Sequence, residues 1–189
     1  MNSTFISFGF VILFNLLFIG CNSKGEAVLN IPKEYESCCG LEPVEYRAGD
    51  AYMYVPNVFT PNGDGINDFF VPTINDEILN IDSYLIYTGE GDTVIFYRQG
   101  FDFSNIENYA WNGLRHNIGD VYKGKFKYQI YYILKGGGIY LAEGYACRLV
   151  CGPDLAAFKD KEGCFYPNQI NNSGFLDASI SSREENCFK

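Results

Sequence analysis

Short apolar runs separated by turn residues fill the middle of the chain, and they predict a β-rich domain. The clearest run is Lys125 to Leu134, where the even-numbered residues are apolar or aromatic while Lys125, Lys127 and Gln129 lie on the other face. A period of two over this length is typical of a strand with one buried face. The expected strands are Ala51 to Val58, Asp68 to Pro72, Ile81 to Tyr87, Thr93 to Arg98, Lys125 to Leu134 and Ile139 to Leu149.

Glycine-containing segments between these runs predict hairpin turns. Gly136 to Gly138 precede the last strand, and Gly89 to Asp92 separate the strands expected at 81–87 and 93–98. Glycine accepts the positive φ angles that tight hairpins need. No amphipathic helix is evident after the N-terminal segment, and the periodicity ends after Val150. The sequence therefore predicts an all-β fold: an antiparallel β-sandwich over residues 51–150, followed by a cysteine-rich C-terminal extension over residues 151–189.

The first twenty residues have the pattern of an export signal. Phe5 to Gly20 is almost wholly apolar, and this run is shorter than the roughly 20 residues that a spanning helix needs. The end of the run, Gly20-Cys21, resembles the bacterial lipobox. That resemblance implies that residues 1–20 are removed and that Cys21 is lipidated, so that residues 21–50 form a tether to the outer membrane. An ordinary signal peptide with a coincidental cysteine is the alternative, and a retained membrane anchor is a weaker one.

Composition and charge agree with an exported globular chain. Apolar residues make up 47% and aromatic residues 17% of the sequence, and aromatic residues favour strands. The formal net charge of −9 argues against a nucleic-acid partner, because an acidic body repels a phosphate backbone.

Cysteine usage predicts a disulfide framework. Six of the seven cysteines remain once Cys21 is set aside, and an even number in an exported chain is typical of disulfides. A metal site is the alternative, but the spacings lack paired CxxC motifs and His116 is the single histidine. Because a bond between adjacent cysteines is strained, we expect Cys38 and Cys39 to pair with members of the C-terminal group. That group consists of Cys147, Cys151, Cys164 and Cys187.

The most distinctive stretch is PNVFTPNGDGINDFF, which spans residues 56–70. It predicts a strand end followed by a tight polar loop, in which proline fixes φ, glycine permits positive φ, and Asn and Asp side chains bond back to the backbone. The loop residues are Pro61, Asn62, Gly63, Asp64, Gly65, Asn67 and Asp68. A calcium loop of the EF-hand type is the alternative, but this alignment places Thr60 and Val71 at two essential ligand positions. We therefore expect a structural loop and no metal.

This stretch closely resembles the opening of the gliding motility-associated C-terminal domain, the type B sorting domain of the type IX secretion system. The resemblance continues at Ile81 to Tyr87, Trp111-Asn112-Gly113, Gly124 to Ile130 and Gly144 to Val150, and it covers about residues 51–150. It implies an immunoglobulin-like β-sandwich. In the family this domain usually closes a long secreted protein and acts as an export and surface-attachment signal, whereas here it follows its own lipid signal.

Candidate catalytic groups are scarce. His116 has no local Ser or Asp arrangement around it, and the sequence contains no nucleophile elbow, phosphate-binding loop or paired histidines. Trp111 is expected to fill the core, and outward-facing Tyr131 could contribute to a binding face. We therefore expect a non-enzymatic envelope lipoprotein without a cofactor that presents an interaction module to a protein partner, on the cell surface or the periplasmic face. The alternatives are an accessory glycan- or peptide-binding lipoprotein with exposed aromatic residues, and a hydrolase with two facing carboxylates in a pocket.

Overall fold

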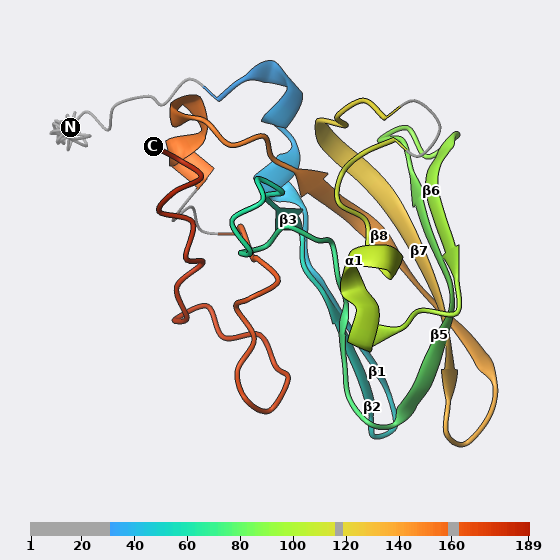
Figure 1. Ribbon diagram of the computed structural model, residues 1–189. Coiled ribbons are helices and arrows are strands. Elements are labelled where there is room, and N and C mark those ends of the chain that lie inside the picture. Colours follow the sequence, from blue (N-terminus) through green and yellow to red (C-terminus); the bar gives the residue numbers. More distant parts are fainter. Residues whose placement is uncertain (1–30, 116–118, 159–162) are drawn as a thin grey trace, which may run out of the picture.

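The computed structural model describes residues 31–115, 119–158 and 163–189. The described chain is mostly β, and it forms a three-stranded and a five-stranded sheet (Figure 1). The smaller sheet has the order β1 (Val44–Ala48), β2 (Ala51–Val55), β4 (Thr73–Ile74). The larger sheet has the order β3 (Val58–Phe59), β8 (Ile139–Arg148), β7 (Gly124–Leu134), β5 (Ile78–Tyr87), β6 (Val94–Gln99). All pairs are antiparallel except β3 with β8, so the predicted β class and antiparallel pairing are confirmed.

Helical segments are short and lie between the strands or at the ends. They are η1 (Lys33–Tyr35), η2 (Cys38–Gly40), η3 (Phe103–Asn105), α1 (Ile106–Tyr109) and η4 (Pro153–Phe158). Within the described ranges, no helix has the length and apolar character needed to cross a membrane.

The two sheets share one aromatic core. Strand β7 alternates as predicted, with Phe126, Tyr128, Ile130 and Tyr132 buried and the residues between them half-buried. Met53 and Val55 of β2 face the same core from the smaller sheet. Trp111 is wholly buried in it, with its ring 4.8 Å from that of Phe126 and 5.5 Å from that of Phe59.

The strand predicted over Ala51 to Val58 is divided between the two sheets. Pro56 has no backbone N–H to donate, and the wholly buried Asn57 turns the chain. The Asn57 side chain donates to the backbone oxygens of Leu41 and Gly163, at 2.6 Å each, and accepts from the N–H of Phe165 at 2.7 Å. These three bonds explain the break after β2 and the crossing to β3.

The strand predicted over Asp68 to Pro72 is also absent from the structure. In this segment only Phe70 pairs, in a single antiparallel bridge with Trp111, and the chain re-enters a sheet at β4. The N–H of Phe70 donates to the Trp111 carbonyl oxygen at 2.9 Å. This short segment therefore anchors the loop of residues 61–68 to the core and adds no strand.

The segment expected to be a tether, residues 21–50, contributes a strand where it is described. Strand β1 pairs with β2 through a tight turn at Gly49 and Asp50, and Gly49 has a φ of 61°. Val44 and Tyr46 pack against the core, and the Tyr46 ring lies 5.5 Å from that of Tyr132. The folded domain therefore begins before residue 51. The predicted signal peptide, Cys21 and His116 lie outside the described residues.

The C-terminal extension covers the far side of the three-stranded sheet. Tyr52 and Tyr54 alternate with the core residues of β2, yet they are almost completely buried. The Phe175 ring lies 4.7 Å from the Tyr52 ring, and the Arg47 guanidinium stacks on both rings at 4.8–4.9 Å. Figure 1 shows this layer, in red, beside β1 and β2. The extension predicted from its cysteines is thus a third layer of the fold.

A second apolar cluster holds the first and the last described segments of the chain together. It lies against Val58 of β3 and Cys147 of β8, which alternate with residues of the main core, and against Leu149 just after β8. Its other buried members are Tyr35, Cys38, Leu155, Phe158, Cys164, Tyr166, Cys187 and Phe188. The N-terminal and C-terminal segments therefore meet in a small core of their own.

Candidate functional site

Disulfides tie the first and the last described segments of the chain to strand β8 and to the residues that follow it. Cys38 bonds to Cys147 and Cys151 bonds to Cys187, with Cα–Cα distances of 5.4 and 4.6 Å. Cys164 is also disulfide-bonded. The predicted use of cysteines in disulfides is confirmed for these residues, and a disulfide sulfur is not the thiolate that binds a metal. Cys38 pairs with the C-terminal group, as its position next to Cys39 predicts.

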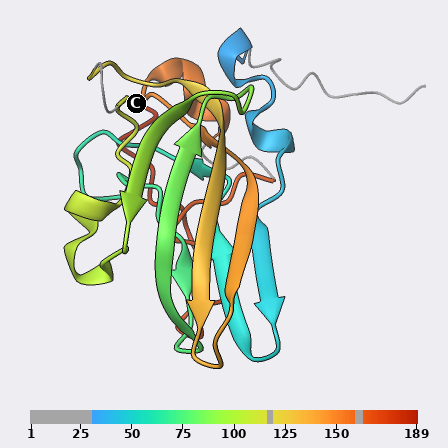
Figure 2. The ribbon, with the colours of Figure 1, turned by 90° about the vertical axis from the view of Figure 1, so that its right-hand side faces the viewer.

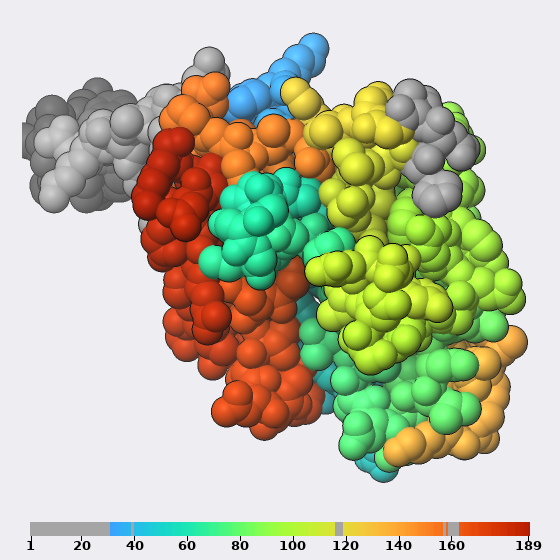
Figure 3. All heavy atoms as spheres, viewed as in Figure 1, coloured from blue at the N-terminus to red at the C-terminus, as the bar shows by residue number. Residues whose placement is uncertain are grey.

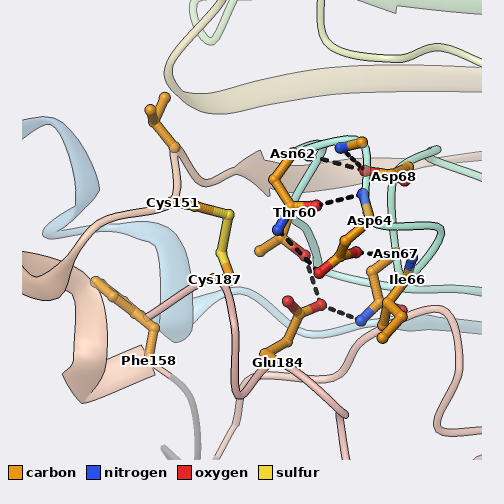
Figure 4. The surroundings of a disulfide bond; sticks show 12 residues. Thr60, Asn62, Asp64, Ile66, Asn67, Asp68, Cys151, Phe158, Glu184 and Cys187 are labelled. Atoms are coloured by element: carbon orange, nitrogen blue, oxygen red, sulfur yellow. Dashed lines mark hydrogen bonds between the residues drawn. A yellow bond between two sulfur atoms is a disulfide. The ribbon is translucent and has the colours of Figure 1, made fainter. Parts of the chain in front are cut away.

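The loop of residues 61–68 is organised by the carboxylate of Asp68. One oxygen accepts from the N–H groups of Asn62 and Gly63 at 2.8 and 2.7 Å, and the other accepts from that of Gly65 at 2.7 Å. The Asp64 side chain accepts from the N–H of Ile66 at 2.9 Å. Figure 4 shows these bonds converging within the loop. Its acidic side chains therefore bind the loop's own backbone, and the described residues hold no group of three or more side chains placed to ligate a metal ion.

Glu184 joins this loop to the C-terminal extension. One carboxylate oxygen of Glu184 accepts from the Thr60 hydroxyl at 2.5 Å and from the Asn67 side-chain amide (Figure 4). The same amide donates to the Ser182 carbonyl oxygen at 3.0 Å. Figure 3 shows the extension, in orange-red to red, lying directly beside the teal loop.

The Glu184 carboxylate is wholly buried, and its second oxygen has no hydrogen-bond partner among the described residues. Burial raises the pKa of Glu184, the nearby Asp64 and Asp68 raise it further, and the bonds from Asn67 and Thr60 oppose this shift. Sequence reasoning missed this residue because it lies in a polar stretch without periodicity. Its partner Asn67 was expected to bond within the loop, and it reaches the extension instead.

Exchanging Glu184 for Gln is expected to flatten the dependence of stability on pH. Because the pKa is higher in the folded state than in the unfolded chain, the folded state binds more protons between those two values. Stability therefore falls as the pH rises through that window, and it is highest below it. Glutamine keeps the acceptor oxygen but does not titrate. Melting temperatures measured from about pH 4 to about pH 8, which brackets the usual glutamate range, should fall more steeply for the natural chain than for the variant.

Glu185, the exposed neighbour of Glu184, provides the matched control. Glu185→Gln should reproduce the slope of the natural chain, because its carboxylate is solvated in both states. Equal slopes for the natural chain and Glu184→Gln would contradict the role assigned to the buried carboxylate.

The outer side of the five-stranded sheet carries a group of tyrosines from four adjacent strands. Register places Tyr97 of β6 beside Leu85, Tyr87 of β5 beside Lys127, and Tyr145 of β8 on the far side of Lys127. Tyr131 of β7 lies between Ser83 and Leu141 on the same side. We call this surface, defined by Tyr87, Tyr97, Tyr131 and Tyr145 around Gln129, the tyrosine face. In Figure 2 these four strands lie in front, with β1 and β2 behind them.

The described residues leave the tyrosine face accessible. Tyr97 and Tyr145 are 45% and 39% exposed, whereas Tyr87 and Tyr131 are half-buried between their neighbours. On the equivalent side of β2 both Tyr52 and Tyr54 are buried, and the Phe175 ring of the C-terminal extension packs on Tyr52. The outer sides of the two sheets therefore differ in accessibility. A disulfide-linked layer covers the smaller sheet, whereas the larger sheet presents aromatic rings to solvent.

A polar network fixes the centre of the tyrosine face. The Tyr87 hydroxyl donates to the Gln129 side-chain oxygen at 2.8 Å, and the Gln129 amide donates to Glu143 at 3.0 Å. The Lys127 ammonium lies 3.4 Å from the same carboxylate oxygen. These contacts hold the pKa of Glu143 below its usual range, with the Gln129 bond as the largest cause. Side chains held in this way are pre-organised, so a ligand would meet an ordered surface.

Two carboxylates also share a hollow of about 490 Å³ beside the loop of residues 61–68. Asp68 and Glu107 line it together with Arg148, Leu114 and Asn112. Asp68 accepts three backbone hydrogen bonds, so its oxygens are engaged by the loop. A glycosidase pair requires two carboxyl groups that face one space, and in this hollow one of the two, Asp68, also organises the loop.

A scan of the chain against models of known protein families finds no match, and a search of curated proteins finds no similar sequence.

Proposed function

We propose that this chain is a non-enzymatic interaction module with an immunoglobulin-like fold, exported and tethered by a lipid on Cys21 to the outer membrane. The observation that carries the proposal is the tyrosine face: four tyrosines on four adjacent strands, of which Tyr97 and Tyr145 are exposed, while the C-terminal extension covers the smaller sheet. Exposed aromatic surfaces are enriched where proteins bind partners. The sequence resemblance to the type B sorting domain links the module to the envelope of a gliding-type bacterium.

The disulfides and the third layer support a role outside the cytoplasm. Bonds such as Cys38–Cys147 form and persist in oxidising compartments. The C-terminal extension closes one side of the fold and leaves the tyrosine face as the surface for a ligand. A tether through residue 21 would place this surface in the envelope, on the periplasmic or the external side.

Site-specific cross-linking in the native envelope tests this function. We expect that Tyr97→p-benzoylphenylalanine gives a discrete adduct after irradiation, because this position lies on the tyrosine face. The matched control is Tyr140, which is 37% exposed and stacks on Tyr132 on the opposite side of the sheet. The same substitution there should give no adduct.

A second arm of the experiment follows the tether. The natural chain should fractionate with the outer membrane, and Cys21→Ser should release the chain without lowering its melting temperature. Equal yields of adduct at Tyr97 and Tyr140 would contradict the assignment of the tyrosine face as the binding surface. A Cys21→Ser variant that still fractionates with the membrane would contradict the lipid anchor.

A further inference from the structure

The size of the tyrosine face limits what can bind there. Tyr97 and Tyr145 lie on strands separated by three inter-strand gaps, which corresponds to about 14 Å. Lys127 and Tyr131 are four positions apart along β7, which is also about 14 Å. The face therefore covers on the order of 200 Å², whereas a standard protein–protein interface buries about 800 Å² on each partner. A short stretch of a thin polymer matches this footprint better than a folded protein.

The face combines aromatic rings with polar groups, and Leu85 lies between Tyr97 and Gln129. The rings of Tyr97 and Tyr145 flank a centre occupied by Gln129, whose side chain is held by Tyr87 and Glu143. A pyranose ring has the complementary surface, because its C–H groups pack on an aromatic ring while its hydroxyls reach hydrogen-bonding groups at the edge. Tyrosine also loses little conformational entropy when it becomes fixed in a complex.

Charge selects among the possible polymers. Glu143 neutralises Lys127 at 3.4 Å, and the Lys125 ammonium stacks 5.2 Å over the Tyr145 ring. The face therefore has little net charge of its own, and the chain as a whole carries −9. An acidic polymer would be repelled at long range, and the face lacks the row of cations that would overcome this repulsion.

We propose that the tyrosine face binds a neutral polysaccharide, laid across β6, β5, β7 and β8 from Tyr97 to Tyr145. This inference rests on the proposed function and names the ligand class of the same surface. The two outer tyrosines stack on sugar rings, and Gln129 hydrogen-bonds the hydroxyls between them.

Affinity electrophoresis of the full chain tests the ligand class. The gels contain xyloglucan, mixed-linkage β-glucan, galactomannan or pullulan as neutral probes, and polygalacturonate as an acidic one. We expect at least one neutral polymer to retard the chain. Replacing both outer tyrosines, as Tyr97→Ala with Tyr145→Ala, should weaken that retardation at least tenfold. Tyr140→Ala should leave it unchanged, because this similarly exposed tyrosine lies on the opposite side of β8.

Three results would overturn the ligand class: retardation by polygalacturonate alone, no retardation by any neutral polymer, or retardation that survives the double substitution. Circular dichroism of the double variant separates lost binding from lost folding, and the single variants Tyr97→Ala and Tyr145→Ala repeat the test if the double variant is unfolded. Cross-linking at Tyr97 keeps the two proposals distinguishable. If Tyr97 gives a protein adduct and no polysaccharide retards the chain, the proposed interaction module stands and the proposed polysaccharide ligand is wrong.

Discussion

Replacing Cys38 and Cys147 together by Ala is expected to lower the free energy of unfolding by about 4.8 kcal/mol, from the entropy of closing a loop across 109 positions. The bond joins the segment before β1 to the end of β8, so its loss frees a large part of the unfolded chain. Both sulfurs are buried in the second apolar cluster, and the alanines leave a small void there. Urea unfolding of the full chain under non-reducing conditions measures the change.

The bond between Cys151 and Cys187 provides an internal comparison. It spans 36 positions, so the same relation gives about 3.8 kcal/mol for the matched pair of alanines. Both double variants should therefore be clearly destabilised, with the larger loss for Cys38 and Cys147. A loss below about 1 kcal/mol for either pair would mean that native contacts alone hold that segment in place.

Periodicity predicted the long strands correctly because each buries one face over many residues. In β7 the alternation continues through the first ten of its eleven positions, and no local feature competes with it. Strand β1 has the same alternation, with Val44 and Tyr46 turned to the core, but over only five residues. It follows a polar segment, and its short length made it indistinguishable from a tether. Strand β1 forms because it pairs with β2, and such pairing cannot be predicted from the local sequence of β1 alone.

The break between β2 and β3 depends on residues remote in sequence. Pro56 is a local signal, but the turn is completed by bonds from Asn57 to the chain at residues 41, 163 and 165. The junction of Asn67 with Glu184 is likewise formed across 117 positions. Neither contact produces a periodic pattern in the sequence. The sequence therefore predicted a polar loop and a polar tail, but not the contact between them.

The tyrosine face was predicted only at Tyr131. Tyr87, Tyr97 and Tyr145 each stand at an outward position of a predicted strand, but their proximity depends on the order β8-β7-β5-β6 and on the register between strands. A bulge near Ile86 and Tyr87 shifts one of these registers, and sequence alternation alone does not locate it. The candidate site is therefore a product of sheet topology.

Exchanging Trp111 for Ala is expected to cost about 3–5 kcal/mol of stability, the range for removing a large aromatic side chain from a core. The indole is wholly buried among Phe59, Phe126 and Tyr122, and its N–H donates to the Leu114 carbonyl oxygen at 2.8 Å. Trp111→Phe should cost less, because it keeps an aromatic ring in the core and loses this bond and only part of the buried ring surface. Trp111 is the single tryptophan, so unfolding in urea must be followed by circular dichroism and not by tryptophan fluorescence.

Phe103 provides the aromatic control for this experiment, because it is 36% exposed and lies in η3 at the edge of the core. Its ring contacts that of Phe101 at 4.7 Å, but much of its surface is already in water, so Phe103→Ala should cost about 1 kcal/mol. The order of loss should then be Trp111→Ala, Trp111→Phe and Phe103→Ala. If Trp111→Ala loses no more free energy of unfolding than Phe103→Ala, the indole does not fill the space between the sheets. The assignment of Trp111 to the shared core would then be wrong.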